Sequence, residues 1–338
     1  MIRGHPRESG DPCSARLAWI PAFAGMTAAA LAGMTSFYLQ PSPPRQFTAF
    51  CSLLSAFSIP THWRIHAEGS IYAGILNHNQ IRKEMPDRAY IIAESNWRTV
   101  RDTQYNVAVL PWGATEAHNY HLPYATDVIE SEAVAAEAGR LAWDAGARVA
   151  ILPAVPFGVN TGQLDIKLCI NMNPSTQAAV LGDVASSLEG QGIHKLVILN
   201  GHGGNDFRGI IRELQPRTKV FLSSIDWYKC VDPRPFFDEP GDHAGELETS
   251  MVMHIAPSLV RPLSEAGPGA ERRARITALR EGRAWAPRRW TAVSDDTGIG
   301  NPAAASAEKG ERFLGAVARY IADYLVELDA VDTGDLYA

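Results

Sequence analysis

Three short segments of the sequence gather side chains that can bind a metal ion or transfer a proton. The first segment contains Glu116 and His118, two residues apart, and then Asp127. An extended backbone turns residues two apart to the same side, and carboxylates together with imidazoles suit first-row divalent metals. The same pattern fits a helix cap followed by a solvated loop, so this segment alone leaves both interpretations open.

A second segment places His202 among the three glycines of residues 201–204. Glycines after a strand are typical of phosphate-binding loops, but the spacing matches neither G-x-G-x-x-G nor the Walker motif with its lysine and hydroxyl residue. A metal-binding histidine that needs a close approach of the backbone explains the pattern better. The alternative is a tight turn without a ligand.

A third segment carries His243, Glu246 and Glu248 at the predicted start of a helix that runs to Ile255. His243 and Glu246 are three residues apart, so we expect them to share one helix face. Acidic residues also complement the positive end of a helix dipole, which is a purely structural explanation. Three such segments favour a functional site, because independent placement rarely produces three clusters at the ends of three elements.

The elements expected around these segments alternate between strand and helix. Short apolar runs predict buried strands at 106–111, 148–155, 195–200 and 219–223, with a further extended segment at 164–170. Helical periods cover 126–145, 174–190, 206–214 and 304–328, and Thr126 is the expected N-cap of the first helix. The alternation predicts the α/β class, as a three-layer α/β/α domain with a mostly parallel central sheet. Ligands of such sheets bind at the carboxyl ends of strands, where the first two segments lie.

The composition of the 338-residue chain limits its class and location. With 46% hydrophobic and 20% charged residues it is globular rather than disordered. A formal net charge of −6 argues against a nucleic-acid-coating protein. The four cysteines are scattered without a C-x-x-C pair, which favours a reducing cytoplasm over a disulfide framework. We expect no membrane partner, since the apolar stretch near the N-terminus is short and interrupted by proline and glycine.

Residues 1–84 differ from the rest of the chain, and we predict that they form a leader outside the working fold. The segment is basic and contains many prolines, and no strand or helix period runs through it for long. It resembles translated intergenic repeat sequence ahead of bacterial proteins, which favours a disordered leader or a start-site artefact with the true start at Met85. A signal or anchor sequence and an extra subdomain are the alternatives. The working domain is then a single unit over 85–338.

The three segments resemble signatures of the creatininase (creatinine amidohydrolase) family. The run G-A-T-E-A-H-N-Y-H-L-P-Y-A-T-D is similar to the first signature, and N-G-H-G-G-N and H-A-G-E-L-E-T-S are similar to the second and third. T-G-I-G-N-P at 297–302 and A-E-K-G at 307–310 are similar to the closing segment of the family. The resemblance covers residues 90–330 in the expected order, and it implies a creatininase-like fold.

The resemblance also implies two divalent metal ions, with Zn²⁺ first and Mn²⁺ or Fe²⁺ as alternatives. The implied ligands, with Asp127 bridging the two ions, are Glu116, His118, Asp127 and His202. Creatininase takes a further carboxylate ligand two residues after the histidine of the second signature, where this chain has Gly204. Glu246 and Glu248 are the candidates to replace it, and we favour Glu248, as a ligand that also serves catalysis. His243 matches the histidine that handles protons at the substrate in this family.

Other positions are expected to contact substrate or to support the ligands. These positions are His121, Glu246, Gly203 and Trp227. For Trp227, an aromatic wall of the substrate site and packing in the core are both open, and core packing is favoured. Creatininase carries a tyrosine where this chain has Gly203, and the usual Glu-Gln-His-Gly opening is Glu-Ala-His-Asn here. These departures argue against creatinine itself as the substrate.

We therefore predict a metal-dependent amidohydrolase that cleaves a non-peptide amide, lactam or formamide bond of a small molecule with a metal-activated water. One alternative is a formamide hydrolase of a flavin-type or peptide-derived cofactor pathway that uses one metal. Another is a non-catalytic metal-binding protein of the same fold. Family resemblance implies a homo-oligomer, often a hexamer, and the arginine-rich segment 271–289 is expected to be a solvated face or a subunit interface rather than a nucleic-acid site.

Overall fold

The computed structural model describes residues 88–337, so the predicted leader at 1–84 lies outside the described residues. Within the described part, four strands form one sheet in the order β2-β1-β3-β4, and every neighbouring pair is parallel. The strands are β1 (Val107–Trp112), β2 (Val149–Ile151), β3 (Lys195–Asn200) and β4 (Phe221–Asp226). The residues of β1, β2 and β3 are nearly all buried, as expected for parallel strands that are covered on both faces, whereas the edge strand β4 is mostly half-buried.

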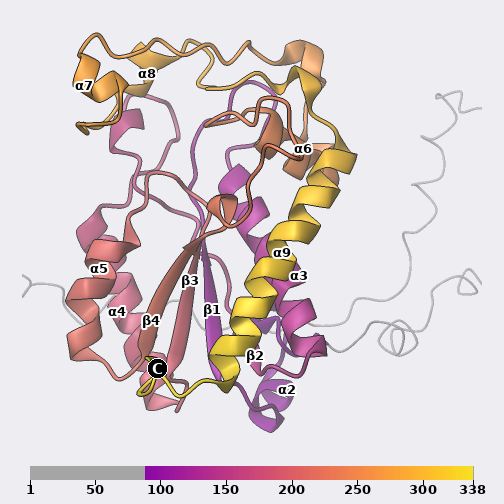
Figure 1. Cartoon of the computed structure of the whole chain (residues 1–338), viewed down its shortest axis with the longest axis vertical. Helices are drawn as coiled ribbons and strands as arrows, with labels where there is room; N and C mark the ends of the chain where they lie inside the picture. The colour runs from indigo at the N-terminus through magenta and orange to yellow at the C-terminus, as the bar shows by residue number, and fades with distance from the viewer. Residues whose placement is uncertain (1–87, 338) are drawn as a thin grey trace, which may run out of the picture. The chain divides into compact units, whose positions relative to one another are not determined.

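Helices cover both faces of the sheet (Figure 1). The helices α3 (Thr126–Asp144) and α9 (Ala307–Ala330) lie on one face, and α4 (Pro174–Gly190) and α5 (Phe207–Leu214) lie on the other. Each face of the sheet has its own hydrophobic core, and alternate residues of β1 point into opposite cores. Val107 and Val109 pack with α3 and α9, and Ala108 and Leu110 pack with α4 and α5. The predicted three-layer α/β/α fold is therefore confirmed.

The carboxyl ends of the strands are aligned by their register. Trp112 at the end of β1 lies opposite Asn200 of β3, which lies opposite Asp226 of β4. The loops that leave these strands therefore start from one edge of the sheet. Helix α6 (Glu246–Ile255) packs against α9 and α3.

The smaller elements lie outside the sheet layers. They are α2 (Trp97–Asp102), α7 (Thr277–Arg280) and α8 (Trp290–Val293). Figure 1 places α7 and α8 at the end of the molecule opposite the C-terminus. Among the helices of residues 88–337, none is long and apolar enough to cross a membrane.

Local details differ from the sequence-based expectations in several places, and β4 begins and ends later than the predicted 219–223. Residues 164–170 are mostly turns that follow a short 3₁₀ helix, Thr161–Gln163, so the extended segment predicted there is wrong. Thr126 is the first residue of α3 rather than its N-cap, and its hydroxyl donates to the Pro123 carbonyl. Helix α6 begins only at Glu246, because the backbone of His243 is paired with Ile299 in an antiparallel bridge. His243 and Glu246 therefore do not share a helix face.

Candidate active site

The structure brings the three chemical segments together beyond the carboxyl ends of β1 and β3. Glu116 and His118 lie in the loop after β1, and Asp127 lies in the first turn of α3. His202 follows β3, while His243 precedes α6 and Glu248 belongs to its first turn. All are buried except Glu248, which is partly buried.

Two glycines allow these segments to approach one another. A Cβ at Gly113, just after β1, would lie 2.7 Å from the backbone nitrogen of Val128 and 2.8 Å from the carbonyl carbon of Asp127. A Cβ at Gly201, after β3, would overlap the hydroxyl of Ser131 in α3. Glycine at both strand ends therefore lets the loops of β1 and β3 contact the beginning of α3.

Asp127 lies between two histidines, and each of its oxygens faces a different imidazole. Oδ2 is 3.0 Å from Nδ1 of His202, and Oδ1 is 2.9 Å from Nε2 of His118. Glu116 joins the first of these contacts, with Oε1 3.0 Å from the same Nδ1 of His202. Both oxygens of Asp127 are therefore directed at potential ligand atoms of the cluster.

Backbone carbonyls orient both imidazoles. Nε2 of His202 lies 3.1 Å from the Val159 carbonyl oxygen, and Nδ1 of His118 lies 3.1 Å from the Glu116 carbonyl oxygen. A ring nitrogen that donates to a carbonyl carries the hydrogen, so the other nitrogen presents its lone pair. Nδ1 of His202 and Nε2 of His118 are therefore the atoms available to a metal.

The donor atoms of the cluster fit divalent metal ions. Nε2 of His118 and Oδ2 of Asp127 are buried and have no hydrogen-bond partner. The atoms that face them are themselves potential ligand atoms, Oδ1 of Asp127 at 2.9 Å from the first and Nδ1 of His202 at 3.0 Å from the second. Two sets of potential ligand atoms, each within 4.8 Å, share Asp127: one adds Glu116 and His202, and the other adds His118 and Glu248. Lone pairs that converge without hydrogen bonds favour a cation between them, and nitrogen with carboxylate oxygen suits Zn²⁺ or Mn²⁺.

The pKa values of the cluster show the strength of its negative field. Burial opposes charge on His118, yet the carboxylates of Asp127, Glu248 and Glu116 outweigh it and raise its pKa to about 10. The pKa of His202 is likewise raised well above its ordinary value against the cost of burial. Burial opposes ionisation of Asp127 also, but His118 and His202 lower its pKa. A field that stabilises imidazolium in a buried site also stabilises a bound dication.

Glu248 and Glu246 have different surroundings although they are only two residues apart. Glu248 is in one of the potential ligand sets that contain Asp127. Glu246 is fully buried and already paired, since its carboxylate accepts from Nζ of Lys309 and from the backbone nitrogen of Glu239. Glu246 therefore ties α6 to α9 and to the preceding loop, whereas Glu248 accepts from the backbone nitrogen of Ala244 and contributes a potential ligand atom to the cluster.

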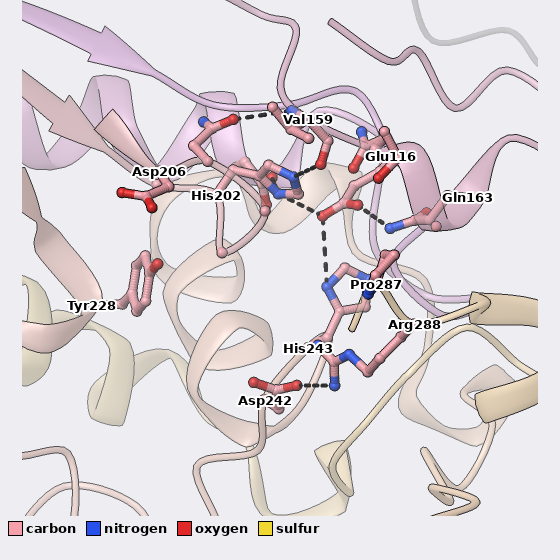
Figure 2. Close-up of a pocket in the computed structure, with 18 of the residues that line it drawn as sticks. Glu116, Val159, Gln163, His202, Asp206, Tyr228, Asp242, His243, Pro287 and Arg288 are labelled. Carbon is pink, nitrogen blue, oxygen red and sulfur yellow. Dashed lines mark hydrogen bonds and ion pairs between the residues drawn. The ribbon is translucent and has the colours of Figure 1, made fainter. Parts of the chain in front are cut away.

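His243 packs against the cluster on the side of the cavity. Its ring centroid lies 4.2 Å from that of His118 and 5.1 Å from that of Trp290. Nε2 lies 2.8 Å from the Ala117 carbonyl oxygen, so Nδ1, 3.7 Å from Oε1 of Glu116, is the nitrogen left for chemistry. Figure 2 shows His202 and His243 both directed at the same oxygen of Glu116.

The remaining predicted positions lie at different depths. Gly203 is exposed and lines the cavity, whereas His121 is fully buried with Nε2 2.8 Å from the Thr249 hydroxyl. Trp227 is 1% exposed and packs in the core beside α3 and α9, so its possible role as a substrate wall is wrong. The adjacent Tyr228 lines the cavity instead.

The cavity beside the cluster has a volume of about 1170 Å³. Residues that the sequence analysis did not single out form much of its wall, including Gln163, Tyr228, Arg288 and Trp290. Arg288 forms an ion pair with Asp242 at 2.8 Å, and its guanidinium lies 4.5 Å from the ring centre of Trp290. Figure 2 shows Arg288 and Asp242 beside His243. No motif surrounds these wall residues, since they come from loops that meet only in the folded chain.

Comparisons with known proteins identify the family of this chain. The sequence model of one family, creatininase, described as creatinine amidohydrolase, matches residues 93–325. The solved structure of a putative creatinine amidohydrolase from Bacteroides fragilis is 42% identical, with a TM-score of 0.71 over 75% of this chain and 100% of that one. A Mycobacterium tuberculosis relative named mycofactocin precursor peptide peptidase is 28% identical over 216 residues, which are 62% of this chain and 80% of the relative. A mutant creatininase of Zn–Zn type is 22% identical, with a TM-score of 0.56 over 72% of this chain and 99% of that one, and shares the fold.

Together with the buried cluster, these matches define a metal-dependent hydrolase that acts on carbon–nitrogen bonds. More narrowly, the chain belongs to the creatininase family, because the family match extends over most of its length. The predictions of family and of enzyme class are confirmed.

Proposed function

We propose that this protein hydrolyses the amide-type bond of a small molecule with two divalent ions, Zn²⁺ in first place and Mn²⁺ or Fe²⁺ as competitors. The observation that carries the proposal is the position of Asp127, whose two oxygens face His118 and His202 separately. Glu116 would complete one ligand set and Glu248 the other. Solved structures of the same fold include a Zn–Zn form and a Mn form of creatininase, which supports divalent ions of this kind.

The residues of the chain have separate tasks in the proposed reaction. Divalent ions in such a ligand set lower the pKa of water toward about 7 and polarise a carbonyl group. His243 moves the proton: its Nε2 is held by the Ala117 carbonyl, so Nδ1 delivers the proton to the departing nitrogen. Tyr228 and Trp290 form apolar walls that orient the substrate and exclude water.

A larger amide substrate is the second candidate, and the size of the cavity favours it. Its volume of about 1170 Å³ is above the range of roughly 300–1,000 Å³ that is usual for drug-sized ligands. Creatinine, a single small ring, would fill little of this space. The M. tuberculosis relative is named for cleavage of a precursor peptide, which supports a substrate of peptide or cofactor size.

A hydrolysis panel with metal analysis tests the proposal. Formamides, lactams, hydantoin-like rings and short peptides are incubated with the protein after loading with Zn²⁺ or Mn²⁺. We expect turnover of at least one class, and we expect Asp127→Ala to lose tight binding of both metals. Full metal occupancy in that variant contradicts the bridging role, and a single equivalent in the wild type favours the one-metal alternative. Stoichiometric metal without any turnover favours a non-catalytic metal-binding protein.

The homo-oligomer and the cytoplasmic location stay predictions. Light scattering coupled to size-exclusion chromatography tests the first. The arginine-rich segment 271–289 is largely exposed, which is compatible with the predicted solvated face or subunit interface.

A further inference from the structure

A chain of buried and partly buried hydrogen bonds reaches Glu116 from the side away from the histidines. Gln163 is 4% exposed, and its amide nitrogen donates to Oε2 of Glu116. Its amide oxygen accepts from Sγ of Cys169 at 3.2 Å, and the same sulfur accepts from the backbone nitrogen of Ala117 at 3.3 Å. This hydrogen-bond relay, from Glu116 through Gln163 and Cys169 to Ala117, therefore starts and ends in the loop that carries Glu116.

The relay fixes which end of the Gln163 amide faces the carboxylate. The backbone N–H of Ala117 can only donate, so Cys169 accepts there and has its own hydrogen for the Gln163 oxygen. A flipped amide would place two acceptor oxygens together in a buried site, which is costly. The NH₂ group must therefore point at Glu116.

The two oxygens of Glu116 are thereby given different partners. Oε2 is held by Gln163, whereas Oε1 lies 3.0 Å from Nδ1 of His202 and 3.7 Å from Nδ1 of His243. Figure 2 shows Gln163 on one side of the carboxylate and the histidines on the other. A carboxylate held in this way offers one oxygen to a metal instead of two.

The turn that carries Gln163 is itself anchored to the cavity wall. A Cβ at Gly162 would overlap the Arg288 carbonyl oxygen, so the two backbones are in close contact. The hydroxyl of Thr291 in α8 donates to Oδ2 of Asp165 at 2.6 Å. The same turn therefore supports both Glu116 and the segment that forms the substrate wall.

We propose that Gln163, fixed by Cys169, is a positioning residue that assigns Oε1 of Glu116 to the metal cluster. This inference rests on the metal site of the proposed function. Partners behind a metal ligand fix its orientation and raise its affinity, and their loss typically weakens metal binding by about 10–100-fold.

The test compares three variants by their metal binding rather than by activity. Gln163→Met keeps the length of the side chain but removes both hydrogen bonds, and we expect its Zn²⁺ dissociation constant, measured against a chromogenic chelator, to rise by roughly 10–100-fold. The visible spectrum of the Co²⁺-loaded variant should also change, because Glu116 can rotate. Cys169→Ser keeps a group that donates and accepts, and should stay close to the wild type, whereas Cys169→Ala should weaken binding.

Urea unfolding of the metal-free variants separates positioning from general stability. A positioning role predicts weaker Zn²⁺ binding even in variants whose metal-free unfolding matches the wild type. The inference is overturned if Gln163→Met binds Zn²⁺ with wild-type affinity and an unchanged Co²⁺ spectrum, or if Cys169→Ser is as weak as Cys169→Ala. A wild-type protein that binds metal but cleaves no amide contradicts only the proposed function, and one that binds no metal overturns both.

Discussion

Gly204 has no room for a side chain, and this predicts a large effect of a single methyl group. A Cβ at this position would lie 2.5 Å from Nε2 of His202 and would overlap the carbonyl oxygen of Val159. These two atoms are the partners of the contact that orients the imidazole. Gly204→Ala must therefore push His202 away from Val159 or displace the backbone.

The expected cost has two parts. Overpacking of a well-packed site costs about 1–3 kcal/mol, and loss of one buried hydrogen bond costs about 0.5–1.5 kcal/mol. Together they lower the unfolding free energy by about 1.5–4.5 kcal/mol, which lowers Tm by roughly 3–18 °C for a domain of this size. His202 is a proposed metal ligand, and Gly204→Ala removes the contact with the Val159 carbonyl that orients its ring. The Zn²⁺ affinity of the variant should therefore also fall by about 10–100-fold.

Gly203→Ala is the matched control. A Cβ there would meet only the Tyr228 hydroxyl, at an ordinary 3.9 Å. It should leave metal binding unchanged and should alter stability by no more than about 1 kcal/mol, with a small gain from the less flexible unfolded chain. Chelator competition and urea unfolding of metal-free protein measure both effects. If Gly204→Ala behaves like Gly203→Ala, the contact between His202 and Val159 does not orient the ligand and the reasoning fails.

Three further predictions concern single side chains of the site. Glu248→Gln should weaken metal binding. Glu246→Gln should keep the metal but lose about 1–3 kcal/mol of stability, because Lys309 on α9 loses its charged partner. Equal loss of metal in both variants would contradict the choice of Glu248 as the ligand. His243→Gln should retain the metals while kcat falls by about 10²–10⁴-fold, and loss of metal would make it a ligand instead. Burial and the nearby His118 lower the pKa of His121 to about 4. In the unfolded chain the pKa of His121 is near 6.5, so the unfolded state takes up a proton at a higher pH than the folded state. The free energy of unfolding of the metal-free protein should therefore fall by up to about 3 kcal/mol as the pH falls from 6.5 to 4. His121→Gln should lack this loss in urea titrations at the two pH values, and an identical pH dependence would refute the assignment.

The regular elements could be predicted closely where local patterns define them. Strand β3 at Lys195–Asn200 and helix α4 at Pro174–Gly190 begin and end where the apolar runs and Pro174 predict. Strand β2 is only Val149–Ile151, shorter than its apolar run, because pairing with β1 extends over three residues. Helix α6 begins later than the sequence predicts, at Glu246, because His243 pairs with Ile299 in an antiparallel bridge. Local periodicity cannot predict pairing with a residue so distant in the sequence.

The candidate ligands could also be found from residue type and spacing, but their separate roles could not. The sequence offers Glu246 and Glu248 as candidates with a preference for Glu248, and the contact of Glu246 with Lys309, in α9, distinguishes them. For Trp227 the sequence favours core packing over a substrate wall, but it says nothing of the adjacent Tyr228. Only the packing of the short 3₁₀ turn Trp227–Lys229 against the core shows that Tyr228 is the ring that lines the cavity.

The sequence by itself determined the family, the α/β fold and the set of candidate metal ligands, because these depend on residue type and on short-range order. Only the tertiary structure decided that Asp127 lies between two histidines, that Gln163 supports Glu116, and that Trp227 is excluded from the cavity. Each of these facts joins residues from separate loops at one edge of the sheet. Their distances follow from strand register and from close backbone contacts at glycines, which no local pattern encodes.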